Sequence, residues 1–318
     1  MTPDVSVVIP TLGRVTRLAF ALEALAEQTL APDRFEVIVV GAAGRTRGLE
    51  AGVPDGLQVS LLEAPAPTAS AKRNHGWRAA RGAVIAFTDD DCRPAPDWLE
   101  RLITGVDGSL TFAQGRTEPD PDEECLLRGS AQSVCIRRPS EWFETCNIAY
   151  SRALLERLGG FDEDFEYGGE DTDLGLRAVA VGARQIYIEG ALAWHAVHPR
   201  SPLLMLRNAP PHPTTSLVFA RHPRQRRFLY QGLFWNRRQA RVLAMLTAAA
   251  VLGPSPRAAA ALAIYMVPEV RAVLAGSPPQ TPRAAVRTAY YLSELMARDL
   301  VLFVNSVRRS IETRSPVL

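Results

Sequence analysis

The first ninety residues contain four short apolar runs that alternate with helix-forming stretches, and this pattern restricts the fold more than any other feature. The runs cover residues 5–9, 35–40, 59–62 and 83–87. They are rich in valine, isoleucine or leucine, as buried parallel strands are. Apolar residues at helical spacing occupy 15–30 and 71–81. This order predicts a doubly wound, mainly parallel α/β sheet, which binds its ligands beyond the carboxyl ends of the strands.

The rest of the chain divides near residue 200. The periodicity weakens from residue 110 to about 145, where we expect residues 118–124 to form an exposed acidic loop. An ordered segment, two helices and a strand are then predicted, in that order, at residues 146–150, 152–158, 174–181 and 185–188. After Pro199 the composition changes to arginine, proline, alanine and leucine. We therefore expect one domain over residues 1–199 and a helical region over residues 200–318.

The net charge of +2 hides a strong asymmetry between these two parts. Residues 1–189 contain 19 basic and 30 acidic side chains, whereas residues 190–318 contain 17 basic and 4 acidic ones. Between Glu189 and Glu269 there is no carboxylate, and a group of arginines (Arg221, Arg224, Arg226 and Arg227) lies there. Such a region often meets a polyanion, for example an anionic membrane surface. A solvated basic surface is the simpler alternative.

Three apolar runs in the basic region, at 242–252, 258–267 and 285–304, predict helices. None reaches the roughly 20 uninterrupted apolar residues that a membrane span needs. We expect helices that pack on the first domain, build a homodimer or lie in a membrane interface. Four cysteines without zinc spacing and an N-terminus without a targeting pattern suit a cytoplasmic protein, peripheral to the inner face of the cell membrane if the helices reach it. No nucleic-acid-binding motif is present, so nucleic acid is not an expected partner.

Three consecutive aspartates, Asp89, Asp90 and Asp91, follow the apolar run at 83–87 after a single threonine, Thr88. Neighbouring carboxylates repel one another, and a strand end needs no such cluster in order to fold. Hard divalent cations such as Mg²⁺ and Mn²⁺ bind carboxylate oxygens and remove this repulsion. The alternative is that the carboxylates favour the N-terminus of a helix that follows. The cluster predicts a divalent metal site.

A second acidic cluster, Glu170-Asp171-Thr172-Asp173, follows two glycines and precedes a helix. A carboxylate in the first turn of that helix is suited to removing a proton from a hydroxyl group. Helix capping is the alternative, but it needs only one of these residues. His195 and His198 follow both clusters, and imidazole is a common ligand of Mn²⁺-like metals. We expect His195, rather than His198, to be the ligand.

Five segments resemble those of family 2 glycosyltransferases in order and spacing. They are Val7–Thr11, Ala71–Asn74, Phe87–Cys92, Gly168–Leu174 and His195. The resemblance spans residues 4–198 and implies a nucleotide-sugar-binding catalytic domain with the GT-A fold. It also implies a metal-dependent, inverting transfer of a hexosyl or deoxyhexosyl group from a nucleotide-diphosphate donor to a glycan or lipid-linked acceptor. Such a reaction would serve the synthesis of glycans, glycolipids or cell-envelope polysaccharides.

The resemblance also implies which residues contact the donor. The expected nucleotide-sugar contacts are Pro10, Thr11, Arg14, Arg73, Asn74, Asp89 and Asp90. The first three would border the base and the ribose, whereas Arg73 and Asn74 would contact the nucleotide from the next loop.

The resemblance further implies a metal site and a catalytic base. Asp89 and Asp91 are the acidic positions of the DxD motif, and Asp91 is the more direct ligand of Mn²⁺ or Mg²⁺. His195 would complete the metal or diphosphate contacts. Asp171 would be the catalytic base, supported by Glu170. A one-step inversion needs no further carboxylate as a nucleophile.

One departure from the family pattern concerns the donor base. Family members usually place an aspartate just after the second strand, where it reads the base, often uracil. Residues 40–43 read Val-Gly-Ala-Ala instead, which disfavours a UDP donor and leaves GDP- and dTDP-sugars open.

Two other functions fit this sequence less well than sugar transfer does. A sugar nucleotidyltransferase would need a longer, glycine-rich basic loop than residues 11–14 provide. A non-catalytic sugar- or membrane-binding protein would have no use for both acidic clusters.

Overall fold

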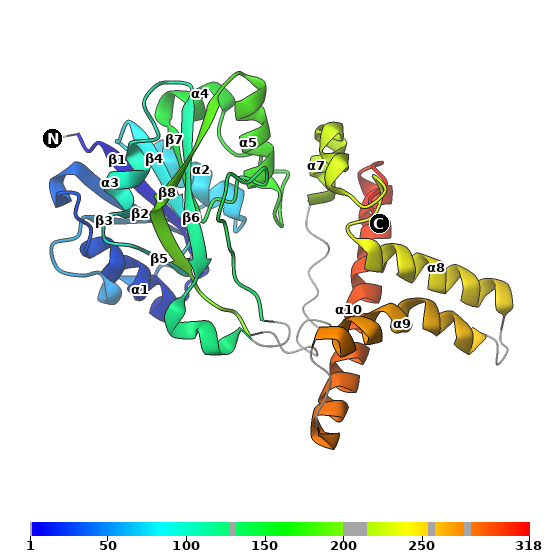
Figure 1. Ribbon diagram of the computed structural model, residues 1–318. Helices are drawn as coiled ribbons and strands as arrows, with labels where there is room; N and C mark the ends of the chain where they lie inside the picture. Colours follow the sequence, from blue (N-terminus) through cyan, green and yellow to red (C-terminus); the bar gives the residue numbers. More distant parts are fainter. Residues whose placement is uncertain (1, 128–130, 200–214, 254–257, 277–280) are drawn as a thin grey trace. The chain divides into compact units, whose positions relative to one another are not determined.

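The computed structural model describes residues 2–127, 131–199, 215–253, 258–276 and 281–318 (Figure 1). The chain divides into two compact units, Met1–Pro199 and Arg200–Leu318. The first unit is a sheet covered by helices, and the second is helical.

The described part of the first unit contains one eight-stranded sheet in the order β3-β2-β1-β4-β7-β6-β8-β5. The strands are β1 Val5–Pro10, β2 Phe35–Ala42, β3 Val59–Ala64, β4 Val84–Thr88, β5 Cys92–Pro94, β6 Thr111–Pro119, β7 Asn147–Ser151 and β8 Arg184–His195. The helices are α1 Val15–Ala26, α2 Ala69–Ala79, α3 Trp98–Ile103, α4 Arg152–Leu158 and α5 Glu170–Ala180, with short 3₁₀ turns η1 Pro32–Arg34, η2 Leu49–Gly52 and η3 Pro121–Leu126.

The predicted α/β class with helices on both faces of the sheet is confirmed. Strands β3, β2, β1 and β4 are parallel to one another, as are β6 and β8. Strand β7 runs antiparallel to both β4 and β6, so the sheet as a whole is mixed. The carboxyl ends of β1 and β4 lie next to each other, which brings the loops after residues 10 and 88 together.

Two predictions for the second half of this unit were wrong in detail. The segment with weak periodicity contains the buried strand β6, and the expected acidic loop begins inside that strand and continues into η3. The strand predicted at 185–188 extends to His195. Strand β6 lacks an apolar pattern because Gln114 and Thr117 are fully buried in it and bond to other parts of the protein.

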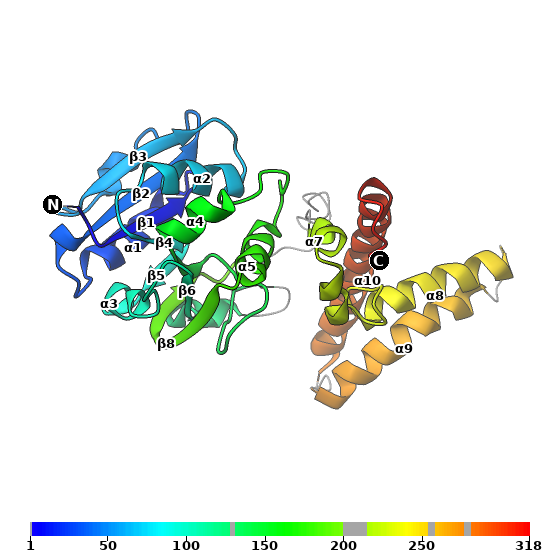
Figure 2. The same ribbon diagram turned by 90° about the horizontal axis from the view of Figure 1, so that it is seen from above.

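Helices cover both faces of the sheet (Figure 2), and the side chains on the two faces form separate hydrophobic clusters. Alternate residues of β1 point to opposite faces, as a strand requires, so Val7 packs with α1 and α3 whereas Val8 packs with α2, α4 and α5. Leu22 and Trp98 belong to the first cluster, and Trp77 belongs to the second. Because both faces are covered, the strands carry the continuous apolar runs from which they were predicted.

The second unit contains α7 Thr215–Arg221, η4 Pro223–Phe228, α8 Arg237–Leu252, α9 Ala258–Gly276 and α10 Pro282–Glu312. Helices therefore form at all three predicted apolar runs. Val242, Tyr265 and Phe303 are buried where α8, α9 and α10 pack together. Among the described residues, no helix is both long and apolar enough to cross a membrane.

A buried carboxylate links the three long helices of the second unit. Asp299 of α10 is only 1% exposed. It accepts hydrogen bonds from the Tyr265 hydroxyl of α9 at 2.7 Å and from Arg238 Nε of α8 at 2.8 Å. Burial and the hydrogen bond to Asp299 raise the pKa of Tyr265, so the hydroxyl remains a donor at all ordinary pH values.

We expect Asp299→Ala to loosen this unit, because it leaves the Tyr265 hydroxyl and the Arg238 guanidinium without their acceptor. The free energy of opening should fall by roughly 1–3 kcal/mol. Hydrogen exchange of α8–α10 in the intact chain measures this loss. The control is Arg298→Ala, which removes a longer contact of 3.3 Å to the same acid and should cost less than about 1 kcal/mol. Equal exchange in the two variants would contradict this view of Asp299.

Candidate functional site

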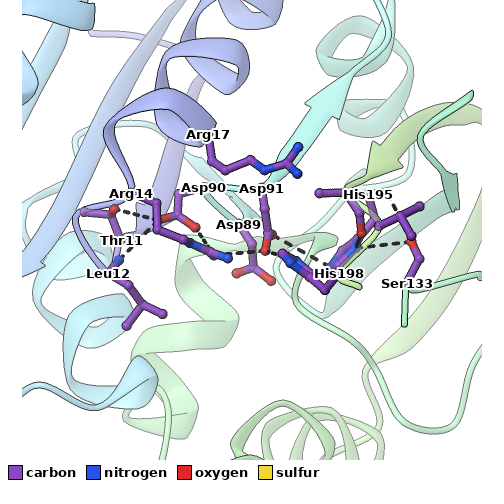
Figure 3. Close-up of polar contacts among 12 residues, drawn as sticks. Thr11, Leu12, Arg14, Arg17, Asp89, Asp90, Asp91, Ser133, His195 and His198 are labelled. Atoms are coloured by element: carbon purple, nitrogen blue, oxygen red, sulfur yellow. Dashed lines mark hydrogen bonds and ion pairs between the residues drawn. The ribbon is translucent and has the colours of Figure 1, made fainter. Parts of the chain in front are cut away.

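The candidate site lies where the loop after β1 meets the aspartates after β4 (Figure 3). Asp90 is 1% exposed and holds this loop. Its carboxylate accepts hydrogen bonds from Thr11 Oγ1 at 2.6 Å and from the Leu12 backbone N–H at 3.1 Å, and it forms an ion pair with Arg14. Gly13 completes the turn with a φ of +80°, which favours glycine. Asp90, predicted to contact the nucleotide-sugar, thus orders the loop that was predicted to border the nucleotide.

Helix α2 supports the same loop from the other side. Lys72 is buried, and its ammonium group donates to the Thr11 carbonyl at 2.9 Å. Burial lowers the pKa of Lys72. Lys72 was not predicted as a site residue, although a buried lysine is usually paired with a specific partner. The only signal for it was that it is the single lysine of the chain.

Arg73 of α2 connects the two acidic clusters that the sequence analysis identified. It donates to Asp89 Oδ1 at 2.9 Å and to Glu170 Oε1 at 2.8 Å, and its side chain is 5% exposed. Burial disfavours its charge, but Asp89 and Glu170 together raise the pKa of Arg73 above its ordinary value. Residues that lie 16 and 97 positions from it in sequence are thereby held in one site.

Asn74 differs from its prediction in two respects. It lies within helix α2, as Arg73 does, and not in a loop. Its amide nitrogen donates to the Phe161 carbonyl and to Glu163, both at 2.8 Å, and its oxygen accepts from Phe161 N–H and Trp77 Nε1. Because both ends of the amide bond to protein, Asn74 positions residues 161–163 and is not available as a direct nucleotide contact.

Helix α5 presents the second acidic cluster. Gly169 precedes it with a φ of +97°, and Glu170 and Asp171 occupy its first turn. Asp171 is half-buried and accepts a hydrogen bond of 2.7 Å from the Thr172 backbone N–H. Burial and the neighbouring Glu170 charge raise the pKa of Asp171 to about 8. A carboxyl group with this pKa can take up a proton near neutral pH, as a general base must.

Two buried polar atoms between these clusters have no hydrogen-bond partner among the described residues. They are Arg73 Nε, a donor, and Glu170 Oε2, an acceptor. A buried polar atom that stays unpaired costs about 1–3 kcal/mol, so such atoms usually mark a place for a ligand or a bound water.

Asp91 lies between two histidines at the end of β8. His198 Nε2 is 2.9 Å from Asp91 Oδ2, and His195 Nε2 is 3.8 Å from Asp91 Oδ1. Arg14 also approaches Asp91, at 2.9 Å. Burial alone would raise the pKa of Asp91, but the hydrogen bond from His198 and the nearby His195 and Arg14 lower it below its ordinary value. Asp91 is therefore a carboxylate at any physiological pH.

The orientation of His195 suits a metal ligand. Its Nδ1 lies 2.8 Å from the Ala196 carbonyl, and a carbonyl oxygen can only accept, so Nδ1 carries the proton. When the ring is neutral, Nε2 carries a lone pair and lies 3.8 Å from Asp91 Oδ1, which is also an acceptor. A cation between them would satisfy both. Fixing the ring through the other nitrogen is a common feature of metal-binding histidines.

Two of the three potential metal ligands at this place, an aspartate and a histidine, suit a metal such as Mn²⁺. Among the described residues, Asp91, Cys92 and His195 form a group whose ligand atoms lie within 4.8 Å of one another. A hydrogen bond with Cys146, together with burial, raises the pKa of the Cys92 thiol, so Cys92 remains a thiol and a poor ligand. Asp89, predicted as a second ligand, lies outside this group. Burial raises the pKa of Asp89, although Arg73 pairs with it.

Ser133 and Glu123 hold the histidine segment and were not predicted. Ser133 Oγ donates to the His195 carbonyl at 3.0 Å. Glu123 pairs with Arg17 of α1 and accepts a hydrogen bond of 2.8 Å from Val197 N–H. Both residues lie in the part of the sequence without a regular pattern, so only their polarity distinguished them.

Comparisons with known proteins show which family this chain resembles. Residues 6–130 match the family model described as glycosyl transferase family 2. A validoxylamine A glucosyltransferase of Streptomyces hygroscopicus subsp. limoneus is 28% identical over 239 residues, which cover 63% of this chain and 53% of the relative. Glycosyltransferase AglE of Haloferax volcanii is 26% identical over 217 residues, which cover 64% of this chain and 70% of the relative. The chain thus spans about half the length of the first of these relatives.

A solved structure shows the same fold. This structure is mannosyltransferase PcManGT from Pyrobaculum calidifontis in complex with GDP-Man and Mn²⁺. The match covers 98% of this chain and 88% of the PcManGT chain, with a TM-score of 0.55 and 21% sequence identity. The fold is that of the GT-A glycosyltransferases. The predicted resemblance to family 2 glycosyltransferases is confirmed.

The raised pKa of Asp171 predicts how stability depends on pH. Between about pH 4, the ordinary value for aspartate, and about pH 8, the folded chain keeps a proton that the unfolded chain has lost. The stability of the folded state therefore falls as the pH rises through this window, because Asp171 ionises in the unfolded chain and stays protonated in the folded one. We expect Asp171→Asn to raise Tm at pH 8.5 and to leave it unchanged at pH 4. Asp55→Asn, at an exposed position, is the control and should show no such trend. A Tm at pH 8.5 no higher than that of the wild type would show that Asp171 is not disfavoured as an anion.

Proposed function

We propose that this chain transfers a sugar from a nucleotide-diphosphate donor to an acceptor hydroxyl, with inversion of the anomeric centre. The observation that carries the proposal is the Arg73 bridge between Asp89 and Glu170. It joins the cluster assigned to the donor with the cluster that contains the assigned base. The match to the glycosyl transferase family 2 model and the glycosyltransferase relatives support the same reaction.

The donor side of the proposed reaction depends on positive charge at the β1 loop. Arg14 and Lys72 both contact this loop or its aspartates, and Arg73 lies beside them. Fixed cations of this kind stabilise the negative charge that develops on a departing diphosphate. The guanidinium of Arg14 is already oriented by Asp90, so little rearrangement is needed when the donor binds.

We assign a divalent cation, Mn²⁺ or Mg²⁺, to Asp91 and His195, with His198 within reach of the same carboxylate. The lone pair of His195 Nε2 and the ionised Asp91 support this assignment. PcManGT, which shares the fold, was solved with Mn²⁺. When bound, the cation would neutralise diphosphate charge as a Lewis acid.

The acceptor side depends on Asp171. We assign it as the base that removes the acceptor's proton while the hydroxyl oxygen attacks the sugar carbon. A pKa of about 8 matches proton transfer near neutral pH. Glu170, held by Arg73, keeps a negative charge next to Asp171 and so contributes to that pKa.

Two variants test this assignment because they should fail differently. Asp91→Ala should abolish Mn²⁺-dependent nucleotide binding and transfer. Asp171→Asn should lower turnover by a factor of roughly 10² to 10⁴ with donor affinity nearly unchanged. Calorimetry with nucleotides and release of nucleoside diphosphate from a panel of nucleotide-sugars measure the two effects. Full activity in excess EDTA would refute the metal assignment. Normal turnover in Asp171→Asn would refute the base.

We further propose that the second unit binds an anionic membrane surface, where the acceptor is attached to a lipid. One face of α10 supports this proposal, because Arg283, Val286, Arg287 and Tyr290 follow helical spacing and are all exposed. Val286 is 72% and Tyr290 61% exposed. Apolar and aromatic side chains next to arginines are typical of helices that lie in a membrane interface.

The basic group at 221–227 is less suited to that role than its sequence implied. Arg226 donates to the Gly232 and Pro316 carbonyls and to Ser315 Oγ, so it holds the C-terminal segment in place. Replacing it would disturb the fold of the second unit as well as its charge.

We expect Arg283→Ser/Arg287→Ser to weaken binding to phosphatidylglycerol vesicles by roughly thirty-fold at low salt, since each arginine near such a surface contributes about 1 kcal/mol. Co-sedimentation at low and high salt measures this. Arg308→Ser/Arg309→Ser is the matched control, because it removes the same charge from residues paired with Glu312. No vesicle binding by the wild type at low salt would refute the proposal and leave these helices a structural or dimer-forming role.

A further inference from the structure

The loop that follows β2 occupies the place where the family pattern puts a base-reading aspartate. Gly41 lies near the end of β2, and a Cβ built on it would approach Thr46 Cγ2 to 2.8 Å. Thr46 is buried there, so the returning loop fills the space that a side chain at position 41 would need. The chain therefore presents a different residue at this edge of the site.

Several hydrogen bonds fix the shape of this loop. Glu63 of β3 accepts from the Gly44 backbone N–H at 2.9 Å and from Thr46 Oγ1 at 2.7 Å. Arg45 N–H closes a turn by donating to the Ala42 carbonyl at 2.9 Å. Arg45 thus lies between two anchored neighbours, and its backbone position is well defined.

Arg45 lies against the β1 loop. A Cβ built on Gly13 would be 3.1 Å from the Arg45 carbonyl oxygen, 3.8 Å from Arg45 Cβ and 3.9 Å from Arg45 Cδ. Gly13 follows directly on Thr11 and Leu12, in the loop assigned to the base and the ribose. Arg45 is exposed, and its guanidinium has no hydrogen-bond or ion-pair partner among the described residues. An unpaired arginine whose backbone position is fixed therefore lies beside the loop assigned to the nucleotide.

We propose that Arg45 reads the base of the donor and that this base is guanine. The inference rests on the proposed function, because it names the donor of that reaction. A guanidinium can only donate hydrogen bonds, and it does so through two parallel N–H groups. Guanine offers two adjacent acceptors, O6 and N7, which match this pair. Uracil and thymine have only one acceptor on the corresponding edge, O4, which lies beside a carbon. Adenine has the acceptor N7 beside an amino group, which is a donor like the guanidinium itself.

The test is calorimetric binding of nucleoside diphosphates to the full-length chain in the presence of Mn²⁺. GDP should bind more tightly than UDP, dTDP or ADP. Arg45→Ala should weaken GDP binding by between about 5- and 150-fold, the usual value of one bidentate pair, and should leave UDP binding within about two-fold. Arg47→Ala, an exposed arginine of the same loop, is the matched control and should leave GDP binding unchanged.

Two analogues of GDP isolate the predicted contact. Inosine diphosphate keeps O6 and N7. In Arg45→Ala it should therefore lose about as much affinity as GDP does. 7-Deaza-GDP lacks N7, so it should bind the wild type more weakly than GDP and should lose little in Arg45→Ala. Equal losses for GDP and 7-deaza-GDP in that variant would overturn the base contact.

The outcomes separate this inference from the proposed function. Preference for UDP, dTDP or ADP, or an equal effect of Arg45→Ala on every nucleotide, overturns the guanine assignment while nucleotide-dependent transfer stands. Binding of no nucleoside diphosphate, with or without Mn²⁺, overturns the proposed function and this inference with it.

Discussion

The buried arginine of α2 is the interaction on which the rest of the candidate site depends. Arg73 must leave water, which costs several kcal/mol for an isolated charge, and the carboxylates of Asp89 and Glu170 are the direct ion-pair partners that compensate for that loss. Because those two residues lie in different segments, the bridge fixes the end of β4 relative to the start of α5. Removing Arg73 would take this partner from both carboxylates at once, so the two acidic clusters depend on the same guanidinium.

Most of the parallel half of the sheet could be predicted because its strands are covered on both faces and are therefore continuously apolar. Strand β6 could not, because its buried Gln114 and Thr117 find partners only in the folded chain. The same limit applies within the site. Asp89, Asp90 and Asp91 are identical neighbours in sequence, yet they face Arg73, the β1 loop and the histidines respectively. Composition cannot distinguish these three directions.

Long-range hydrogen bonds also explain which predicted donor contacts changed. Asn74 occupies the expected position in the sequence, but its amide is committed to Phe161, Glu163 and Trp77. Lys72, two residues earlier in the same helix, was not predicted, and its ammonium group donates to the Thr11 carbonyl. Neighbouring residues on a helix point to different faces, so a motif of adjacent polar residues contains both ligand-facing and structural members. Only the fold assigns them.

Environment rather than residue type separates the two chemical tasks assigned to aspartates here. Asp91 is surrounded by His198, His195 and Arg14, which keep it ionised over the whole physiological range. Asp171 is half-buried beside Glu170, which favours the protonated form up to about pH 8. A cation ligand needs a permanent charge, whereas a base must gain a proton and lose it again within each reaction cycle. The site meets both needs with the same type of residue, because the basic neighbours surround Asp91 whereas the acidic neighbour Glu170 lies next to Asp171.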